Sequence, residues 1–254
     1  MVYITGDCHG DWHKFSSVVF YEQKDLSKEN DFVIVCGDFG LWSDTKQERW
    51  WLDWLEEKNF TILFVDGNHE NFDRLYSNEF PIIDFYGGKA HQIRKNVFHL
   101  IRGNVFELCG KNFFAFGGAN SHDISDGILQ PKDYKDISKC LQHYRKLLSM
   151  GKMVRVNHVS WWEQEMPSQE EMNFGLETLK AHNNKVDFII THCCPQHIAS
   201  VYSNGTYKSD KLTQYFNNIS ENVEFTKWIF GHYHNNMDIL DKYIMLYDQI
   251  IRIV

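Results

Sequence analysis

The N-terminal residues Val2-Tyr3-Ile4-Thr5-Gly6-Asp7-Cys8-His9-Gly10 join a short apolar run directly to a polar loop that lies between glycines. A run of this length and character predicts a short buried strand. The glycines allow the backbone to turn sharply after the strand and to come close to a bound ion or phosphate. An aspartate and a histidine are therefore expected together at the end of the first strand.

Four more motifs repeat this arrangement farther along the chain. They are Gly37-Asp38-Phe39-Gly40, Gly67-Asn68-His69-Glu70, Thr191-His192 and Gly231-His232-Tyr233-His234. The apolar runs that precede them are Phe32–Cys36, Phe60–Val65, Val186–Ile190 and Trp228–Phe230. Ligands of open α/β sheets bind beyond the carboxyl ends of the strands, so the five loops should converge. Each motif alone also fits a turn or a structural histidine, but the ordered set favours one shared site.

Helical patterns separate the first three strands, at about residues 11–21 and at Ser43–Glu57. Continuous apolar strands separated by helices indicate parallel strands that are buried on both faces. Short antiparallel strands are expected in the middle of the chain, and a helix and a hairpin near its end. The middle strands are Val97–Ile101, Val105–Leu108 and Phe113–Phe116, the helix is Gln169–His182, and the hairpin strands are Met237–Leu240 and Tyr243–Leu246.

The composition describes an ordinary globular protein of 254 residues, with 43% hydrophobic and 24% charged residues. Its formal net charge of −8 argues against a large nucleic-acid groove, although bound metal cations would change the local sign. No apolar run is long enough for a membrane span. The six cysteines form no CxxC pair, and we interpret them as reduced thiols of a cytoplasmic protein. The sequence does not predict an oligomeric state.

The residue types in the five motifs suit divalent metal ions. Imidazole nitrogens and carboxylate oxygens are ligands for Mn, Fe or Zn, and no thiolate is required. A shared aspartate can bridge two ions about 3.5–4 Å apart, as in two-metal hydrolases. We therefore expect two divalent metal ions, with Mn favoured and Fe, Zn, Mg and Ni as alternatives.

The ordered motifs resemble the calcineurin-like metallophosphoesterases, whose pattern is D-x-H, G-D, G-N-H-[ED], H and G-H-x-H. The similarity extends from Asp7 to His234, and a bacterial or phage-type member fits best. It implies an α/β fold, a four-layer αββα sandwich with two mixed β-sheets. It also implies that Asp7, His9 and His234 hold one metal, that Asn68, His192 and His232 hold the other, and that Asp38 bridges both. His69 would act as a general acid or stabilise the transition state.

The resemblance implies a hydrolase acting on ester bonds (EC 3.1), with Asp38 and His69 as catalytic residues and a metal-bridging hydroxide as nucleophile. The expected substrate is a phosphate mono- or diester of a small compound, plausibly a nucleotide. A serine/threonine protein phosphatase is an alternative, but the second motif, Gly37-Asp38-Phe39-Gly40-Leu41-Trp42, lacks the Asp and Arg of that form. A non-catalytic scaffold is another, and His69 argues against it.

We expect residues 1–254 to form a single domain with a variable insert at about 120–167, which could form a lid or wall over the metals. Trp161 and Trp162 could stack on a substrate ring or pack in the core. Arg74 could contact the phosphate or form a surface salt bridge. Glu163 and Glu165 are expected to be solvated charges.

Overall fold

The computed structural model describes residues 1–254 and contains two large mixed sheets. The first sheet has the order β15-β1-β2-β3-β6-β5-β4 and the second the order β13-β14-β12-β11-β8-β7. The first comprises β1 (Val2–Thr5), β2 (Phe32–Val35), β3 (Thr61–Phe64), β4 (Ile82–Phe85), β5 (Gly88–Arg94), β6 (Val97–Leu100) and β15 (Ile250–Arg252). The second comprises β7 (Asn104–Leu108), β8 (Lys111–Phe116), β11 (Phe188–Thr191), β12 (Lys227–Phe230), β13 (Met237–Ile239) and β14 (Tyr243–Met245).

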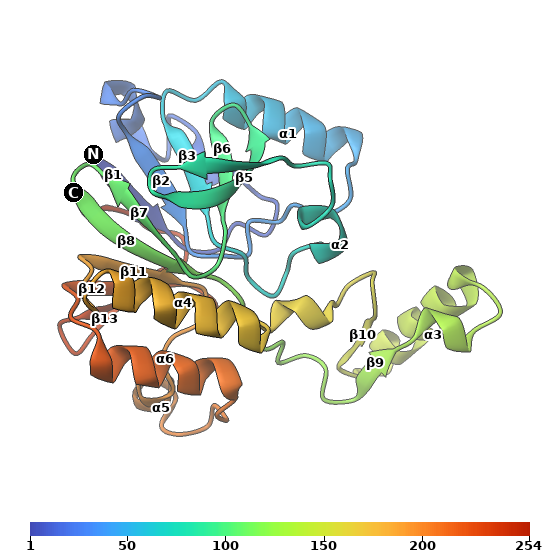
Figure 1. Cartoon of the computed structure of the whole chain (residues 1–254). Coiled ribbons are helices and arrows are strands. Elements are labelled where there is room, and N and C mark those ends of the chain that lie inside the picture. The colour runs from blue at the N-terminus through green and yellow to red at the C-terminus, as the bar shows by residue number, and fades with distance from the viewer.

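The two sheets pack face to face, and helices cover their outer faces (Figure 1). The covering helices are α1 (Lys46–Glu56) and α2 (Phe72–Leu75) on the first sheet, and α4 (Gln169–Ala181), α5 (Gln196–Ser203) and α6 (Lys211–Asn222) on the second. Successive strand residues point to opposite faces. In β2, for example, Phe32 and Ile34 enter the core between the sheets, whereas Val33 and Val35 enter the core under α1. The four-layer αββα sandwich is therefore confirmed.

Side-chain caps fix where the longer helices begin. The Thr45 side chain accepts a hydrogen bond from the backbone N–H of Glu48 at the start of α1. Ser168 and Glu171 form a reciprocal capping box at the start of α4. Such caps satisfy backbone donors that have no partner inside the helix. None of the helices combines the length and the apolar character that crossing a bilayer requires.

The central insert forms an arm (Figure 1). The arm contains the parallel pair β9 (Gly127–Leu129) and β10 (Val154–Val156), the 3₁₀ turn η3 (Pro131–Asp133) and α3 (Ile137–Ser149). Figure 1 shows it projecting from the sandwich, with α3 beside β10. The expected lid or wall over the metals stays a prediction: α3 projects from the sandwich (Figure 1), but burial lowers the pKa of His69 and the charge of Arg155, on β10, adds to this effect.

Three details of the sequence interpretation are corrected. The expected helix at residues 11–21 is a pair of 3₁₀ turns, η1 (His13–Phe15) and η2 (Tyr21–Asp25), because the Ser and Val residues between them are poor helix formers. β6 does not join β7 and β8, since it pairs with β3 and β5 in the first sheet. The strands β4 and β5 were not predicted, and they form an antiparallel hairpin at the edge of that sheet.

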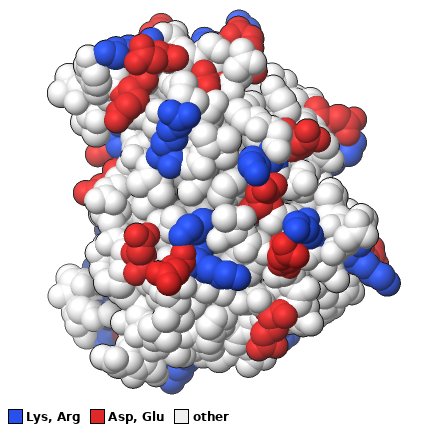
Figure 2. Space-filling view, turned by 90° about the vertical axis from the view of Figure 1, so that its left-hand side faces the viewer, with Lys and Arg blue, Asp and Glu red and all other residues white.

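Charges are mixed on the face of the molecule that Figure 2 shows. On the side of the molecule that carries the two termini, Lys and Arg lie among Asp and Glu and do not gather in one basic strip (Figure 2). This distribution agrees with the net charge of −8.

Candidate metal centre

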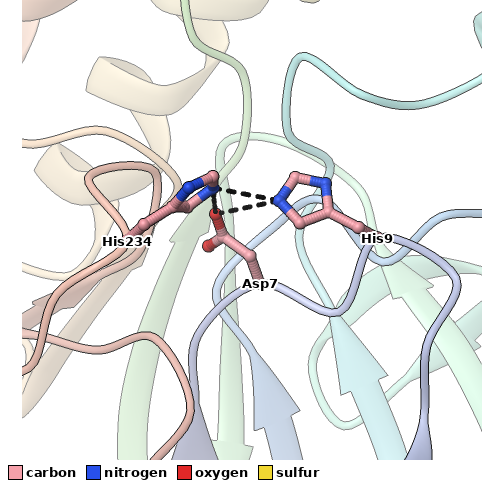
Figure 3. A group of neighbouring side chains, drawn as sticks. All are labelled: Asp7, His9 and His234. Carbon is pink, nitrogen blue, oxygen red and sulfur yellow. Dashed lines mark hydrogen bonds and ion pairs between the residues drawn. The ribbon is translucent and has the colours of Figure 1, made fainter.

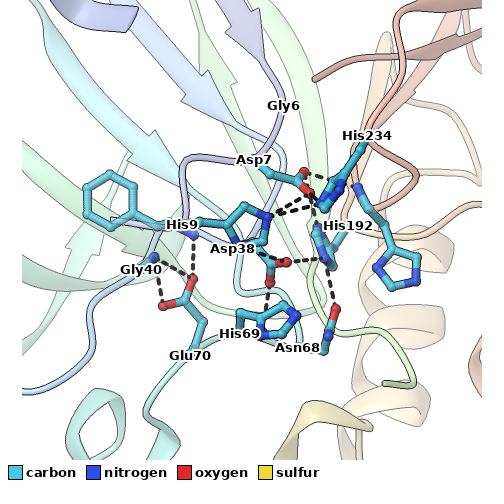
Figure 4. A network of polar contacts seen from close by, with 12 residues as sticks. Gly6, Asp7, His9, Asp38, Gly40, Asn68, His69, Glu70, His192 and His234 are labelled. Carbon is cyan, nitrogen blue, oxygen red and sulfur yellow. Dashed lines mark hydrogen bonds and ion pairs between the residues drawn. The ribbon is translucent and has the colours of Figure 1, made fainter. Parts of the chain in front are cut away.

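Loops from both sheets meet where the central parallel strands end (Figure 4). The loops after β1, β2 and β3 supply Asp7, His9, Asp38, Asn68 and His69, and those after β11 and β12 supply His192, His232 and His234. All seven expected metal ligands come from these loops. Their convergence follows from packing two sheets so that their strand ends lie at a common edge.

One group of three side chains faces a single point (Figure 3). The Nε2 atoms of His9 and His234 are 3.0 Å apart. The Oδ2 atom of Asp7 lies 3.1 Å from Nε2 of His234 and 3.6 Å from Nε2 of His9. This oxygen is buried and accepts no hydrogen bond. Two imidazole nitrogens and an unsatisfied carboxylate oxygen at these distances fit a shared cation.

Asp38 lies between this group and a second group, which is formed by Asp7, Asp38 and His192. Its Oδ2 atom is 3.7 Å from Nδ1 of His9 and 3.3 Å from Nε2 of His192. The Oδ1 atom of Asn68 is 3.2 Å from the same His192 nitrogen. A carboxylate that faces both groups fits the bridging position. Asp7 belongs to the second group as well, since its carboxylate lies 3.9 Å from Nδ1 of His192.

His232 lies beside His192, outside the group formed by Asp7, Asp38 and His192. Its ring centroid is 4.9 Å from that of His192, and its backbone N–H donates to Asp7 Oδ1 at 3.0 Å. Its Nε2 atom lies 2.9 Å from Nε2 of His122. This contact joins His232 to His122, and the expected role of His232 as a metal ligand stays a prediction.

The site stabilises positive charge. Burial alone would raise the pKa of the Asp38 carboxyl, but His192 outweighs it and holds that pKa at about 2. Burial likewise opposes protonation of His192, and Asp38 and Asp7 overcome it and raise the pKa of the imidazole to about 10. Two buried carboxylates therefore attract a proton to a histidine that lies between them, as they would attract a divalent cation.

The backbone is strained at four of the expected metal ligands. His9, Asp38, His232 and His234 have φ of +51°, +47°, +70° and +49°, in the left-handed region. The neighbouring glycines allow very close approach, since a Cβ at Gly67 would lie 2.0 Å from Asp38 Oδ1. Such strain persists only where the surrounding contacts fix the conformation. Glu70 supplies some of these contacts, because its carboxylate accepts from the backbone N–H groups of Phe39 and Leu41 at 2.6 and 3.1 Å.

His69 lies beside the two groups of expected metal ligands but belongs to neither. Its backbone N–H donates to Asp38 Oδ1 at 2.7 Å, and its ring centroid is 5.3 Å from that of His9. The side chain is half-buried and borders an open cavity. Burial lowers the pKa of the imidazole, and the charge of Asp38 partly opposes this shift.

Three residues around the second group were missed by the sequence interpretation. The Nδ2 atom of Asn68 donates to Ser121 Oγ at 3.2 Å, and that hydroxyl donates to Glu165 Oε2 at 2.6 Å. These two hydrogen bonds fix the Asn68 amide so that its Oδ1 atom faces His192. Glu165 is not solvated as expected but 1% exposed, and burial raises its pKa to about 7 although Ser121 donates to it. His122, which contacts His232, is the third.

The three residues expected to bind substrate lie outside the metal groups. Trp162 is 1% exposed and donates its indole N–H to Asp73 at 2.7 Å, so it has no free ring face for stacking. Trp161 is half-buried and borders a separate cavity of about 630 Å³. The guanidinium of Arg74 is paired with Glu48 and Glu79, with its side chain only 9% exposed. This arrangement corresponds to the salt-bridge alternative, except that Arg74 is largely covered.

A comparison with known protein families agrees with the geometry. A family model described as calcineurin-like phosphoesterase matches residues 1–236. No curated protein shows a significant match. Among solved structures, the chain is similar to phosphopantetheinyl hydrolase (PptH) from Mycobacterium tuberculosis, with 14% identity, a TM-score of 0.38, and coverage of 97% of this chain and 89% of that one.

Replacing Asp38 tests the bridging position. We expect Asp38→Asn to lose bound metal, because the oxygen that faces both His9 and His192 would lose its charge. Elemental analysis of the purified variant measures this loss, and thermal unfolding checks that the variant still folds. Asp11→Asn is the control, since Asp11 is exposed and bonds His13. Two metal equivalents retained in Asp38→Asn would contradict the assignment.

Replacing Ser121 tests the orientation of Asn68. Without the Ser121 hydroxyl, the Asn68 amide can rotate, and we expect Ser121→Ala to weaken metal binding by roughly 10–100-fold. Calorimetric titration of the metal-free protein with Mn²⁺ gives the affinity directly. Ser149→Ala, at the exposed end of α3, should bind as the parent does. Equal affinities in both variants would show that Ser121 does not support the site.

Proposed function

We propose, because the chain belongs to the calcineurin-like phosphoesterase family, that it hydrolyses phosphate mono- or diesters of small compounds. The family and the ligand-like side chains support metal-dependent phosphoester hydrolysis. The observation that carries the proposal is the position of Asp38, whose Oδ2 atom faces His9 on one side and His192 on the other. One carboxylate between two sets of nitrogen and oxygen ligands fits a site for two ions.

The proposed ions are Mn²⁺, held by Asp7, His9 and His234 on one side and by Asn68, His192 and His232 on the other, with Asp38 between them. When bound, such a pair polarises the phosphoryl oxygens and lowers the pKa of a water. The chain keeps the two ligand sets in fixed relation through contacts between the two sheets. His192 Nδ1, for example, lies 2.7 Å from the carbonyl oxygen of Cys36.

His69 is proposed as the proton donor to the leaving group. Its backbone is fixed by Asp38, its ring lies beside His9, and part of its side chain is open to the cavity. The imidazole is therefore held where an ester oxygen would leave, without competing for a metal position. A positioned acid of this kind contributes about 10²–10⁴-fold to the rate.

The other two functions are less well supported. The loop after β2 has Gly40-Leu41-Trp42 where the protein phosphatase form would have its Asp and Arg. The presence of His69 beside the ligand groups supports an active enzyme over a scaffold. The six free cysteines, five of them buried, support a reducing, cytoplasmic location.

Turnover by the metal-loaded protein tests the proposal. The Mn²⁺-loaded chain would be assayed on a nucleotide ester, an aryl phosphate diester and a phosphoserine protein in one buffer. We expect kcat/KM to be highest for a small ester and to vanish when a chelator removes the metal. A rate on the phosphoprotein that equals or exceeds those on the small esters would favour the protein phosphatase instead.

Replacing His69 separates its role from metal binding. We expect His69→Asn to lower kcat and kcat/KM together by roughly 10²–10⁴-fold, while two metals stay bound. Steady-state kinetics and elemental analysis on the same preparation measure both quantities. His158→Asn is a matched control, since His158 is exposed and contacts Asp73. Metal loss in His69→Asn would make His69 a ligand and overturn the role given to it.

A further inference from the structure

A cavity of about 370 Å³ opens beside His9 and His69. Trp42 and Trp51 line it, and both are only partly buried. Trp12 lines it as well but is 1% exposed, so it closes the cavity from inside the core. The volume lies in the range of small-molecule sites, roughly 300–1,000 Å³. The two histidines place the cavity next to the position that a phosphate would take in the proposed reaction.

The two partly buried tryptophans are held by other aromatic rings. Trp51 makes an edge contact with Trp54 at a centroid distance of 5.1 Å, and Trp42 makes one with Trp162 at 5.3 Å. Trp162 is in turn fixed by its hydrogen bond to Asp73. Rings held in this way lose little conformational freedom when a ligand binds, which favours affinity.

No lysine or arginine lines the cavity, so His9 and His69 are the only lining residues that can carry a positive charge. Its one carboxylate, Glu48, accepts from the backbone N–H groups of Trp42 and Ser43 at 2.7 and 2.8 Å and pairs with Arg74. Gln47 and Ser43 add neutral polar groups. A second phosphate would therefore find no counter-charge here, whereas an uncharged ring would find aromatic surface and neutral hydrogen-bonding groups.

We propose that this cavity binds an uncharged planar ring of the phosphate ester, such as a nucleobase, with Trp42 and Trp51 as its aromatic walls. The inference rests on the proposed function, because it assumes that the phosphate lies at the metal groups. The substrates of this site are then monophosphate esters that carry a flat, neutral ring. Esters with a further phosphate in the ring position bind less well.

The experiment compares Trp51→Leu and Trp42→Leu with the parent on a ring-bearing ester, a nucleoside monophosphate, and a ring-free ester, glycerol phosphate. Leucine keeps apolar packing but removes the flat surface. We expect kcat/KM for the ring-bearing ester to fall by about 5–150-fold more than for the ring-free ester, the range that base–aromatic stacking gives. Phe174→Leu is the control, since Phe174 is 45% exposed on α4 and does not line the cavity.

Equal losses on both esters would show that the tryptophans only support the fold, and would overturn the proposal. A separate measurement keeps the test independent of catalysis. Binding of a nucleoside without phosphate, followed by ligand-observed NMR, should be seen with the parent and Phe174→Leu and weakened in Trp51→Leu. If the nucleoside binds but no ester is cleaved, the proposed function fails and the ring site stands. If the nucleoside binds equally to all three proteins, the ring site is wrong.

Discussion

Two buried negative charges are the constraint on which the rest of the structure depends. Asp7 and Asp38 are 2% and 1% exposed, and they follow neighbouring parallel strands. Carboxylates that are out of water are costly unless they are compensated by hydrogen bonds or opposite charge. The structure supplies both, with backbone N–H groups of His232 and His69 and with the ring of His192. Because these donors come from both sheets, the sandwich and the site stabilise each other.

A buried ion pair between Asp66 and Arg102 fixes the loops around this centre. Asp66 follows β3 and accepts from Nε of Arg102 at 3.0 Å and from the ring of His99 at 3.1 Å. Arg102 lies where the chain crosses from the first sheet to the second, and it also donates to the carbonyl oxygen of Gln164 at 2.8 Å. The Asp66 carbonyl accepts from the N–H of Gly118. The segments that carry Asn68, Ser121 and Glu165 are therefore fixed relative to one another, although sequence gives no hint of the pair.

The parts that could be predicted from sequence are those whose signal is local. Strands such as β2 and β3 are buried on both faces and are therefore continuous apolar runs, and glycines with Asp, Asn or His mark their ends. The outer contacts of the site had no such signal, because Asn68 and Ser121 are 53 positions apart and Ser121 and Glu165 are 44 apart. Charged residues were misjudged for the same reason. A glutamate is expected to be solvated unless hydrogen-bond donors from distant parts of the sequence are known. Glu165 has such donors in the backbone N–H and the hydroxyl of Ser121. Trp51 lies in the segment Ser43–Glu57, which was expected to be helical, but sequence does not show which side of that helix borders a cavity.

The chain leaves the sandwich after Ser121 and His122, forms the arm of β9, α3 and β10, and returns to the sandwich shortly before Glu165. Both roots of the arm, the segments where it joins the sandwich, therefore lie beside Asn68 and His232. Near the roots, Asp123 accepts from Nε of Arg155 at 2.8 Å and joins the outgoing chain to the returning one. α3 lies beyond this connection and is exposed along most of its surface. Insertions and deletions at the tip of the arm can therefore accumulate during evolution without moving a metal ligand, whereas a change of one residue at either root shifts Ser121 or Glu165 directly.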